Sequence, residues 1–124
     1  MPEQRPRILV VDRPNRAESP RAVLQVLGYE VTEVQSADDG WRVAAEWTPD
    51  VVLCYMRRSA LEGCRLAGEL RRNPATARAR LVALFGYSPA HDARLARDAG
   101  FDHLLVLPVS AEVLGRVLGR DGDG

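Results

Sequence analysis

Three polar side chains stand at the ends of apolar runs, where a nucleophile or a base could be placed. Asp12 and Arg13 follow the apolar run Arg7–Val11, and Tyr55 closes the run at residues 51–55. A phenol has a pKa of about 10 and is protonated at neutral pH, so Tyr55 would need a base to act as a nucleophile. Asp12 is the candidate for that base, and Arg13 could instead pair with it.

Few other residue types that carry chemistry are present. All 17 basic residues are arginine, which excludes every mechanism that requires a lysine. Cys54 and Cys64 are too few for a disulfide framework or a four-thiolate zinc site, so we expect free thiols. His91 and His103 lack metal-ligand spacing to cysteines or acidic residues, and we expect them at the surface. Because no nucleophile–base constellation is evident, we do not expect an enzyme.

Composition limits the remaining classes of protein. The 124 residues suit one domain, with a core over about 7–118 and a polar tail at 119–124. Since 17 basic residues balance 17 acidic ones, we expect neither a nucleic-acid nor an anionic-membrane surface. The chain contains no apolar run long enough to cross a bilayer, and we expect no secretory signal. We therefore expect a cytoplasmic domain.

Apolar runs alternate with amphipathic stretches along the chain. Strands are predicted at Arg7–Val11, Glu30–Val34, 51–55, 81–85 and 104–107, and helices at 18–27, 38–47, Leu61–Arg72, 89–99 and 111–118. Strand followed by helix, five times over, predicts an α/β fold: a doubly wound, five-stranded parallel sheet with helices on both faces. The strand at Glu30–Val34 alternates apolar and polar residues, which is typical of an edge. Ligands of such sheets bind beyond the carboxyl ends of the strands.

Several short segments, taken together and at their spacing, resemble one known family. They are Ile8-Leu-Val-Val-Asp12, Gly28-Tyr-Glu-Val31, Pro49-Asp-Val-Val-Leu53, Leu61-Glu-Gly63, 81–87, Ala99-Gly-Phe-Asp102 and Leu105-Val-Leu-Pro108. From Ile8 to about Leu118, the chain resembles the CheY-like receiver domains of two-component response regulators. The resemblance implies a flavodoxin-like fold with strand order 2-1-3-4-5.

The resemblance also implies a chemistry. In this family a histidine kinase transfers its phosphoryl group to an aspartate that ends the third strand. Two acidic residues after the first strand help to hold Mg²⁺, and a hydroxyl after the fourth strand and a lysine after the fifth contact the phosphoryl oxygens. The carboxylate acts as the nucleophile, while the metal and the lysine neutralise phosphoryl charge.

The chain departs from this pattern at nearly every polar position. The first acidic residue is kept as Asp12, but its partner is Arg13 and the acceptor position is Tyr55. Apolar residues occupy three further positions: Phe85 stands at the hydroxyl position, Leu107 at the lysine position and Leu104 at the aromatic-switch position. The proline after the lysine position is kept as Pro108. We expect Phe85, Leu104 and Leu107 to fill the former phosphorylation pocket as core, and Mg²⁺ binding to be weak or absent.

Our leading hypothesis is therefore a degenerate receiver that acts through its surfaces, independently of phosphorylation. By resemblance, the face at residues 91–118 would meet a protein partner or a second copy of the chain. The candidates for the switch or the interface are Leu104, His103, Arg57 and Arg58. An alternative is a small-ligand or phosphate-sensing domain whose strand ends bind through Arg13, Tyr55 and Arg57, although no glycine-rich phosphate loop follows the first strand.

Overall fold

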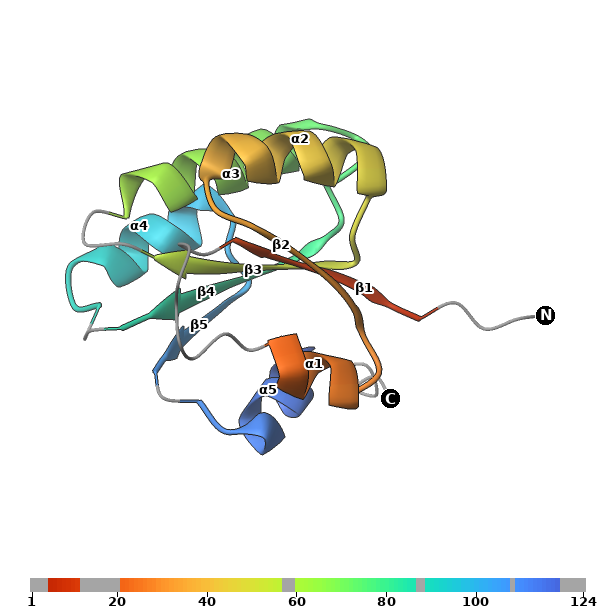
Figure 1. Ribbon diagram of the computed structural model, residues 1–124. Coiled ribbons are helices and arrows are strands. Elements are labelled where there is room, and N and C mark those ends of the chain that lie inside the picture. Colours follow the sequence, from red (N-terminus) through yellow and green to blue (C-terminus); the bar gives the residue numbers. More distant parts are fainter. Residues whose placement is uncertain (1–4, 12–20, 57–59, 87–88, 108, 119–124) are drawn as a thin grey trace.

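The computed structural model describes residues 5–11, 21–56, 60–86, 89–107 and 109–118, in which strands and helices alternate (Figure 1). The strands are β1 Arg7–Val11, β2 Glu30–Val34, β3 Val51–Met56, β4 Arg80–Phe85 and β5 His103–Val106. The helices are α1 Arg21–Val26, α2 Ala37–Trp47, α3 Leu61–Arg72, α4 Asp92–Ala99 and α5 Ala111–Leu118. No helix in these described ranges is long and apolar enough to cross a membrane.

All five strands form one parallel sheet in the order β2-β1-β3-β4-β5. Strand β2 is an edge, as its alternating pattern predicts, whereas β1, β3 and β4 lie inside the sheet and are apolar apart from the arginines that begin β1 and β4 and from Tyr55 of β3. The predicted fold class and strand order are confirmed. Because the strands are parallel, their carboxyl ends meet at one edge of the sheet and their amino ends at the other.

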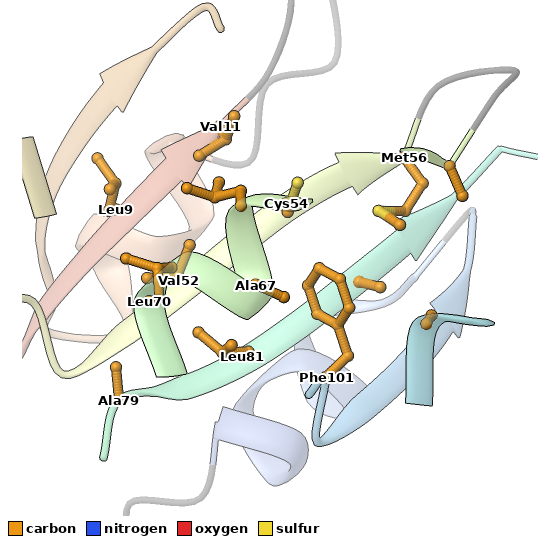
Figure 2. Close-up of a cluster of buried hydrophobic side chains, with 14 of the residues drawn as sticks. Leu9, Val11, Val52, Cys54, Met56, Ala67, Leu70, Ala79, Leu81 and Phe101 are labelled. Carbon is orange, nitrogen blue, oxygen red and sulfur yellow. The ribbon is translucent and has the colours of Figure 1, made fainter. Parts of the chain in front are cut away.

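Two apolar clusters, one on each face of the sheet, form the core. Helices α2, α3 and α4 cover one face, and α1 and α5 cover the other (Figure 1). Figure 2 shows the cluster beneath α2–α4, in which Ala67 and Leu70 of α3 pack against the sheet. Successive strand residues alternate between the clusters, since side chains of a strand point to opposite faces. Cys54 and Met56 thus face α3, and Leu53 faces α1 and α5.

Serine hydroxyls cap two of the helices at their start, and glycines with positive φ follow two others. The Ser36 hydroxyl accepts a hydrogen bond of 3.1 Å from the backbone N–H of Asp39, and the Ser110 hydroxyl accepts one of 3.1 Å from Val113. Gly28 follows α1 with φ of +100°, and Gly100 follows α4 with φ of +122°, a region that favours glycine.

Several boundaries differ from the sequence prediction, most of them by one residue. Helix α4 begins at Asp92 rather than residue 89, although the carbonyl of Pro89 already accepts from the N–H of Ala93 at 2.8 Å. Strand β5 starts and stops one residue earlier than predicted, because Val82 pairs with His103 and Phe85 pairs with Val106. Strand β3 continues to Met56, which pairs with Phe85. The predicted start of the first helix, at 18–20, lies outside the described residues.

Candidate functional site

The carboxyl edge of the sheet holds the positions that the family resemblance marks as the phosphorylation pocket. Tyr55 lies one residue before the end of β3, Phe85 is the last residue of β4, and Leu107 follows β5. Asp12, Arg13 and Pro108, which complete the predicted set, lie outside the described residues, as do Arg57 and Arg58.

These positions divide between the two faces of the sheet instead of filling one pocket. Phe85 is 0% exposed in the cluster beneath α2–α4, and Leu104 packs against the same cluster. Tyr55 and Leu107 are half-buried and pack against the cluster beneath α1 and α5. The strand alternation explains the separation, since Met56, not Tyr55, is the β3 residue that faces the same side as Phe85.

A backbone hydrogen bond joins the ends of β4 and β5. The N–H of Leu107 donates to the carbonyl oxygen of Phe85 at 2.8 Å, one residue beyond the last ladder pair, Phe85 and Val106. The positions that the family resemblance assigns to a hydroxyl and a lysine are thus held together through the main chain. Their side chains are apolar and offer no donor for a phosphoryl oxygen.

A small hollow lies beside Tyr55, between the end of β3 and the start of α2 and α3. Its volume is about 20 Å³, and it is lined by Val11, Gln35, Ser36, Ala37, Cys54, Tyr55, Glu62 and Gly63. That is space for about one water molecule, whereas ligand pockets usually measure about 300–1,000 Å³. Helix α3 lies so close to β3 here that a β-carbon added at Gly63 would meet the Met56 sulfur at 2.6 Å.

Both cysteines are free thiols in the structure, as predicted. Cys54 is buried and Cys64 is half-buried in α3. Burial, together with the negative charge of Asp92, raises the pKa of the Cys64 thiol above its ordinary value. Within the described ranges, no group of three or more His, Cys, Asp or Glu side chains is placed to hold a metal ion.

The histidines lie apart from this edge. His91 is exposed just before α4. His103, which we considered for the switch or the interface, is half-buried at the start of β5, and so it lies at the amino edge of the sheet, opposite Tyr55. Two exposed apolar side chains mark the predicted interaction face: Leu95 of α4 is 51% exposed and Val106 of β5 is 47% exposed.

A second hollow, which was not predicted from the sequence, lies at the amino edge of the sheet. It is open, measures about 1,320 Å³, and is lined by six arginines: Arg5, Arg7, Arg71, Arg78, Arg80 and Arg97. Four of these lie just before or at the start of β1 and β4, and Arg97 lies in the turn of α4 that leads into β5. Because the amino ends of parallel strands meet at one edge of the sheet, arginines that stand just before several strands in the sequence could have predicted a basic edge.

The comparisons with known proteins agree with the fold and the motifs. No protein-family model matches the chain. It is 31% identical over 114 residues to the gliding motility regulatory protein of Myxococcus xanthus, covering 91% of this chain and 15% of that relative. It is 27% identical over 114 residues to RpaA, a DNA-binding dual master transcriptional regulator of Synechocystis, covering 90% of this chain and 47% of the relative. The chain thus spans less than half the length of both curated relatives.

A solved structure matches the chain over nearly its whole length. It is the receiver domain of a sensor histidine kinase from Pseudomonas aeruginosa PAO1, with a magnesium ion coordinated in its active-site cleft. The two chains are 27% identical with a TM-score of 0.79, and the match covers 94% of this chain and 97% of that one. The strand order, the motifs and these matches lead to one family: the chain is a CheY-like receiver domain of the response regulators of two-component signalling.

Proposed function

We propose that this receiver domain works without phosphorylation, as a cytoplasmic protein–protein interaction module and not as an enzyme. The chain would form one domain, with its core at about 7–118. The observation that carries the proposal is the acceptor position, which holds Tyr55, a half-buried ring packed against the apolar cluster beneath α1 and α5. A carboxylate nucleophile would be needed there for phosphotransfer of the family's type.

The chemistry of the remaining residues supports this view. A phenol is protonated at neutral pH and would need a base, for which Asp12 is the candidate. Mg²⁺ prefers one or two carboxylates together with phosphate oxygens in octahedral geometry. The family pattern leaves one carboxylate, Asp12, and places Arg13 beside it, where the guanidinium can pair with that carboxylate. These residues fit a magnesium site poorly, and we assign no step to the metal.

The switch of the family also lacks its usual contacts. A ligand shifts a two-state protein only if it binds the two states differently. The residues that would contact a phosphoryl group and report its presence are replaced by Phe85, Leu104 and Leu107, which pack into the two clusters. We infer that this packing holds the domain in one conformation, so its surface is constantly available to a partner.

The partner we favour is a second copy of the chain, bound through α4, β5 and α5. Leu95 and Val106 are about half exposed on this face. Charges of both signs lie beside them on the same elements: α4 carries Asp92 and Arg94, and α5 carries Glu112 and Arg116. A surface with apolar residues and charges of both signs can complement itself across a twofold axis.

The strand-end alternative, a small-ligand sensor, has less support. The hollow beside Tyr55 measures about 20 Å³ among the described residues, too small for an organic ligand. The arginines named for this alternative, Arg13 and Arg57, lie outside the described residues.

The phosphorylation claim can be tested by titrating the chain with Mg²⁺ and following tryptophan and tyrosine fluorescence, with and without beryllofluoride. We expect no saturable change in either series. A saturable Mg²⁺ response that beryllofluoride enhances would refute the proposal and point to a site rebuilt around Asp12 and Tyr55. Asp12→Asn, which removes the family's retained acid, would then abolish that response.

The interaction claim can be tested separately, by sedimentation velocity. We expect the chain to dimerise and Val106→Glu to dissociate the dimer, because the new carboxylate would be buried without a partner. The matched control is Val26→Glu, at an α1 residue that is 86% exposed outside this face. A wild-type monomer at high concentration, or equal dissociation by both variants, would contradict the proposed dimer face.

A further inference from the structure

The arginine-lined hollow at the amino edge of the sheet, which we call the amino-edge groove, lies opposite the family's phosphorylation pocket. Six arginines and two aspartates, Asp50 and Asp102, line it, while the whole chain has no net charge. Positive charge is therefore concentrated at this edge.

Three of the arginines hold the fold together. All five N–H groups of the Arg71 guanidinium are engaged, by the carbonyl oxygens of Gly100, Ala77 and Ala79 and by the Asp102 carboxylate. Arg80 donates to the last carbonyls of α5, those of Val117 and Leu118, at 3.3 and 2.6 Å. The third, Arg7, donates to the carbonyl of Trp47 at 2.6 Å and lies over its ring.

The two aspartates are also committed. Asp50 accepts a hydrogen bond of 2.8 Å from the backbone N–H of Arg7. Asp102 accepts from Arg71 and, at 2.8 Å, from the backbone N–H of Leu81. Neither carboxylate is paired with the other three arginines of the groove.

The remaining arginines, Arg5, Arg78 and Arg97, are exposed and form no hydrogen bond or ion pair with the described parts of the chain. Arg97 lies in the last turn of α4, where a cation favours the helix dipole. That effect does not account for Arg5 or Arg78, which lie in loops before β1 and β4. Three guanidinium groups that have no partner among the described residues thus line one open groove.

We propose that the amino-edge groove binds an extended acidic segment of a partner protein, a short run rich in aspartate and glutamate. Guanidinium groups bind carboxylates through paired, charge-assisted hydrogen bonds. The groove runs from β1 past β3 and β4 to β5, about 14 Å at the usual spacing of strands. About five residues of extended peptide cover that length.

Two observations favour a peptide over a nucleic acid. Single-stranded nucleic acids bind by stacking bases on exposed aromatic rings, but the aromatic residues that line the groove, Tyr29 and Phe101, are both buried. The balanced charge of the whole chain also gives little long-range attraction for a phosphate backbone. The proposal concerns a different edge from the phosphorylation pocket, so either can fail alone.

The test is fluorescence anisotropy with a labelled hexaglutamate peptide, using a hexaglutamine peptide as the neutral probe. We expect saturable, salt-sensitive binding of hexaglutamate, and no binding of hexaglutamine. The double variant Arg5→Gln, Arg78→Gln should weaken binding by about tenfold. The matched control is Arg65→Gln, Arg72→Gln: both residues are exposed on α3, outside the groove, and lose the same charge.

The control variant should bind within about twofold of the wild type, because neither residue lines the groove and neither can form paired hydrogen bonds with a peptide bound there. Equal weakening by both double variants would show that net charge, not the groove, attracts the peptide and would overturn the proposal. So would the absence of saturable binding by the wild type. Tighter binding of a labelled oligothymidine than of hexaglutamate would assign the groove to nucleic acid instead.

Discussion

Arg71 links two loops that enter the sheet, and its removal is expected to destabilise the domain strongly. Its Nε and Nη2 groups donate to the carbonyl of Gly100 at 3.1 and 2.7 Å, just before β5. Its Nη1 group donates to the carbonyls of Ala77 and Ala79 at 2.8 and 2.7 Å, just before β4. The proposed perturbation is Arg71→Met, which keeps an unbranched apolar stem and removes every donor.

The expected cost follows from these contacts. Hydrogen bonds to charged groups contribute about 1.5–3 kcal/mol each. The five bonds share one guanidinium, and the Arg71 side chain is 26% exposed, so water replaces some of them. Asp102 also keeps its bond to the N–H of Leu81 at 2.8 Å. We therefore expect a loss equivalent to about two such bonds, about 3–6 kcal/mol in the free energy of unfolding.

The assay is urea unfolding at equilibrium, followed by circular dichroism and by tryptophan fluorescence. Arg72→Met is the control, since Arg72 is the next residue of α3, is exposed, and forms no bond with the described residues. The control should change the free energy of unfolding by less than about 0.5 kcal/mol. If Arg71→Met and Arg72→Met differ by less than about 1 kcal/mol, the clamp contributes little and the reasoning is refuted.

The remaining predictions concern a glycine and a thiol. Gly100→Ala should lower the free energy of unfolding more than Gly28→Ala in the same urea assay. Both glycines have positive φ, so both substitutions strain the backbone. A β-carbon at Gly100 also meets the Arg71 side chain at 2.9 Å, whereas one at Gly28 meets nothing within 4 Å. Equal losses would mean that backbone strain alone matters. The pKa of Cys64, raised by burial and by Asp92, should fall in Asp92→Asn, and alkylation at constant pH, measured by peptide mass mapping, should accelerate. An unchanged alkylation rate would contradict the role of Asp92. Because the pKa of the thiol is raised in the folded state, its contribution to stability is complete below the unfolded-state pKa and is lost as pH rises through the folded-state pKa.

Much of the fold could be predicted from local patterns. The strand over Glu30–Val34 alternates apolar and polar residues, and it lies at the edge of the sheet. Ser36 and Ser110 directly precede α2 and α5, and each hydroxyl accepts a hydrogen bond from the backbone N–H three residues later. These features depend on neighbours in the sequence, so sequence periodicity and residue type suffice to predict them.

The arrangement of the candidate site depended on contacts that local patterns do not contain. Phe85 and Tyr55 both stand near strand ends, but the register of β3 against β4 places them on opposite faces of the sheet. The amino-edge groove was missed because its arginines come from four separate segments. Which of them are engaged by carbonyl oxygens, such as those that Arg71 binds, follows from tertiary packing alone.

The central claim, that this receiver domain has no working phosphoacceptor, is tested most directly by intact-mass spectrometry. The chain would be incubated with acetyl phosphate and Mg²⁺, beside a receiver domain that retains its acceptor aspartate as a positive control. Our account predicts a phosphoryl adduct on the control and an unchanged mass for this chain. A phosphoryl adduct on this chain that disappears in Tyr55→Phe would contradict the account and identify Tyr55 as the acceptor.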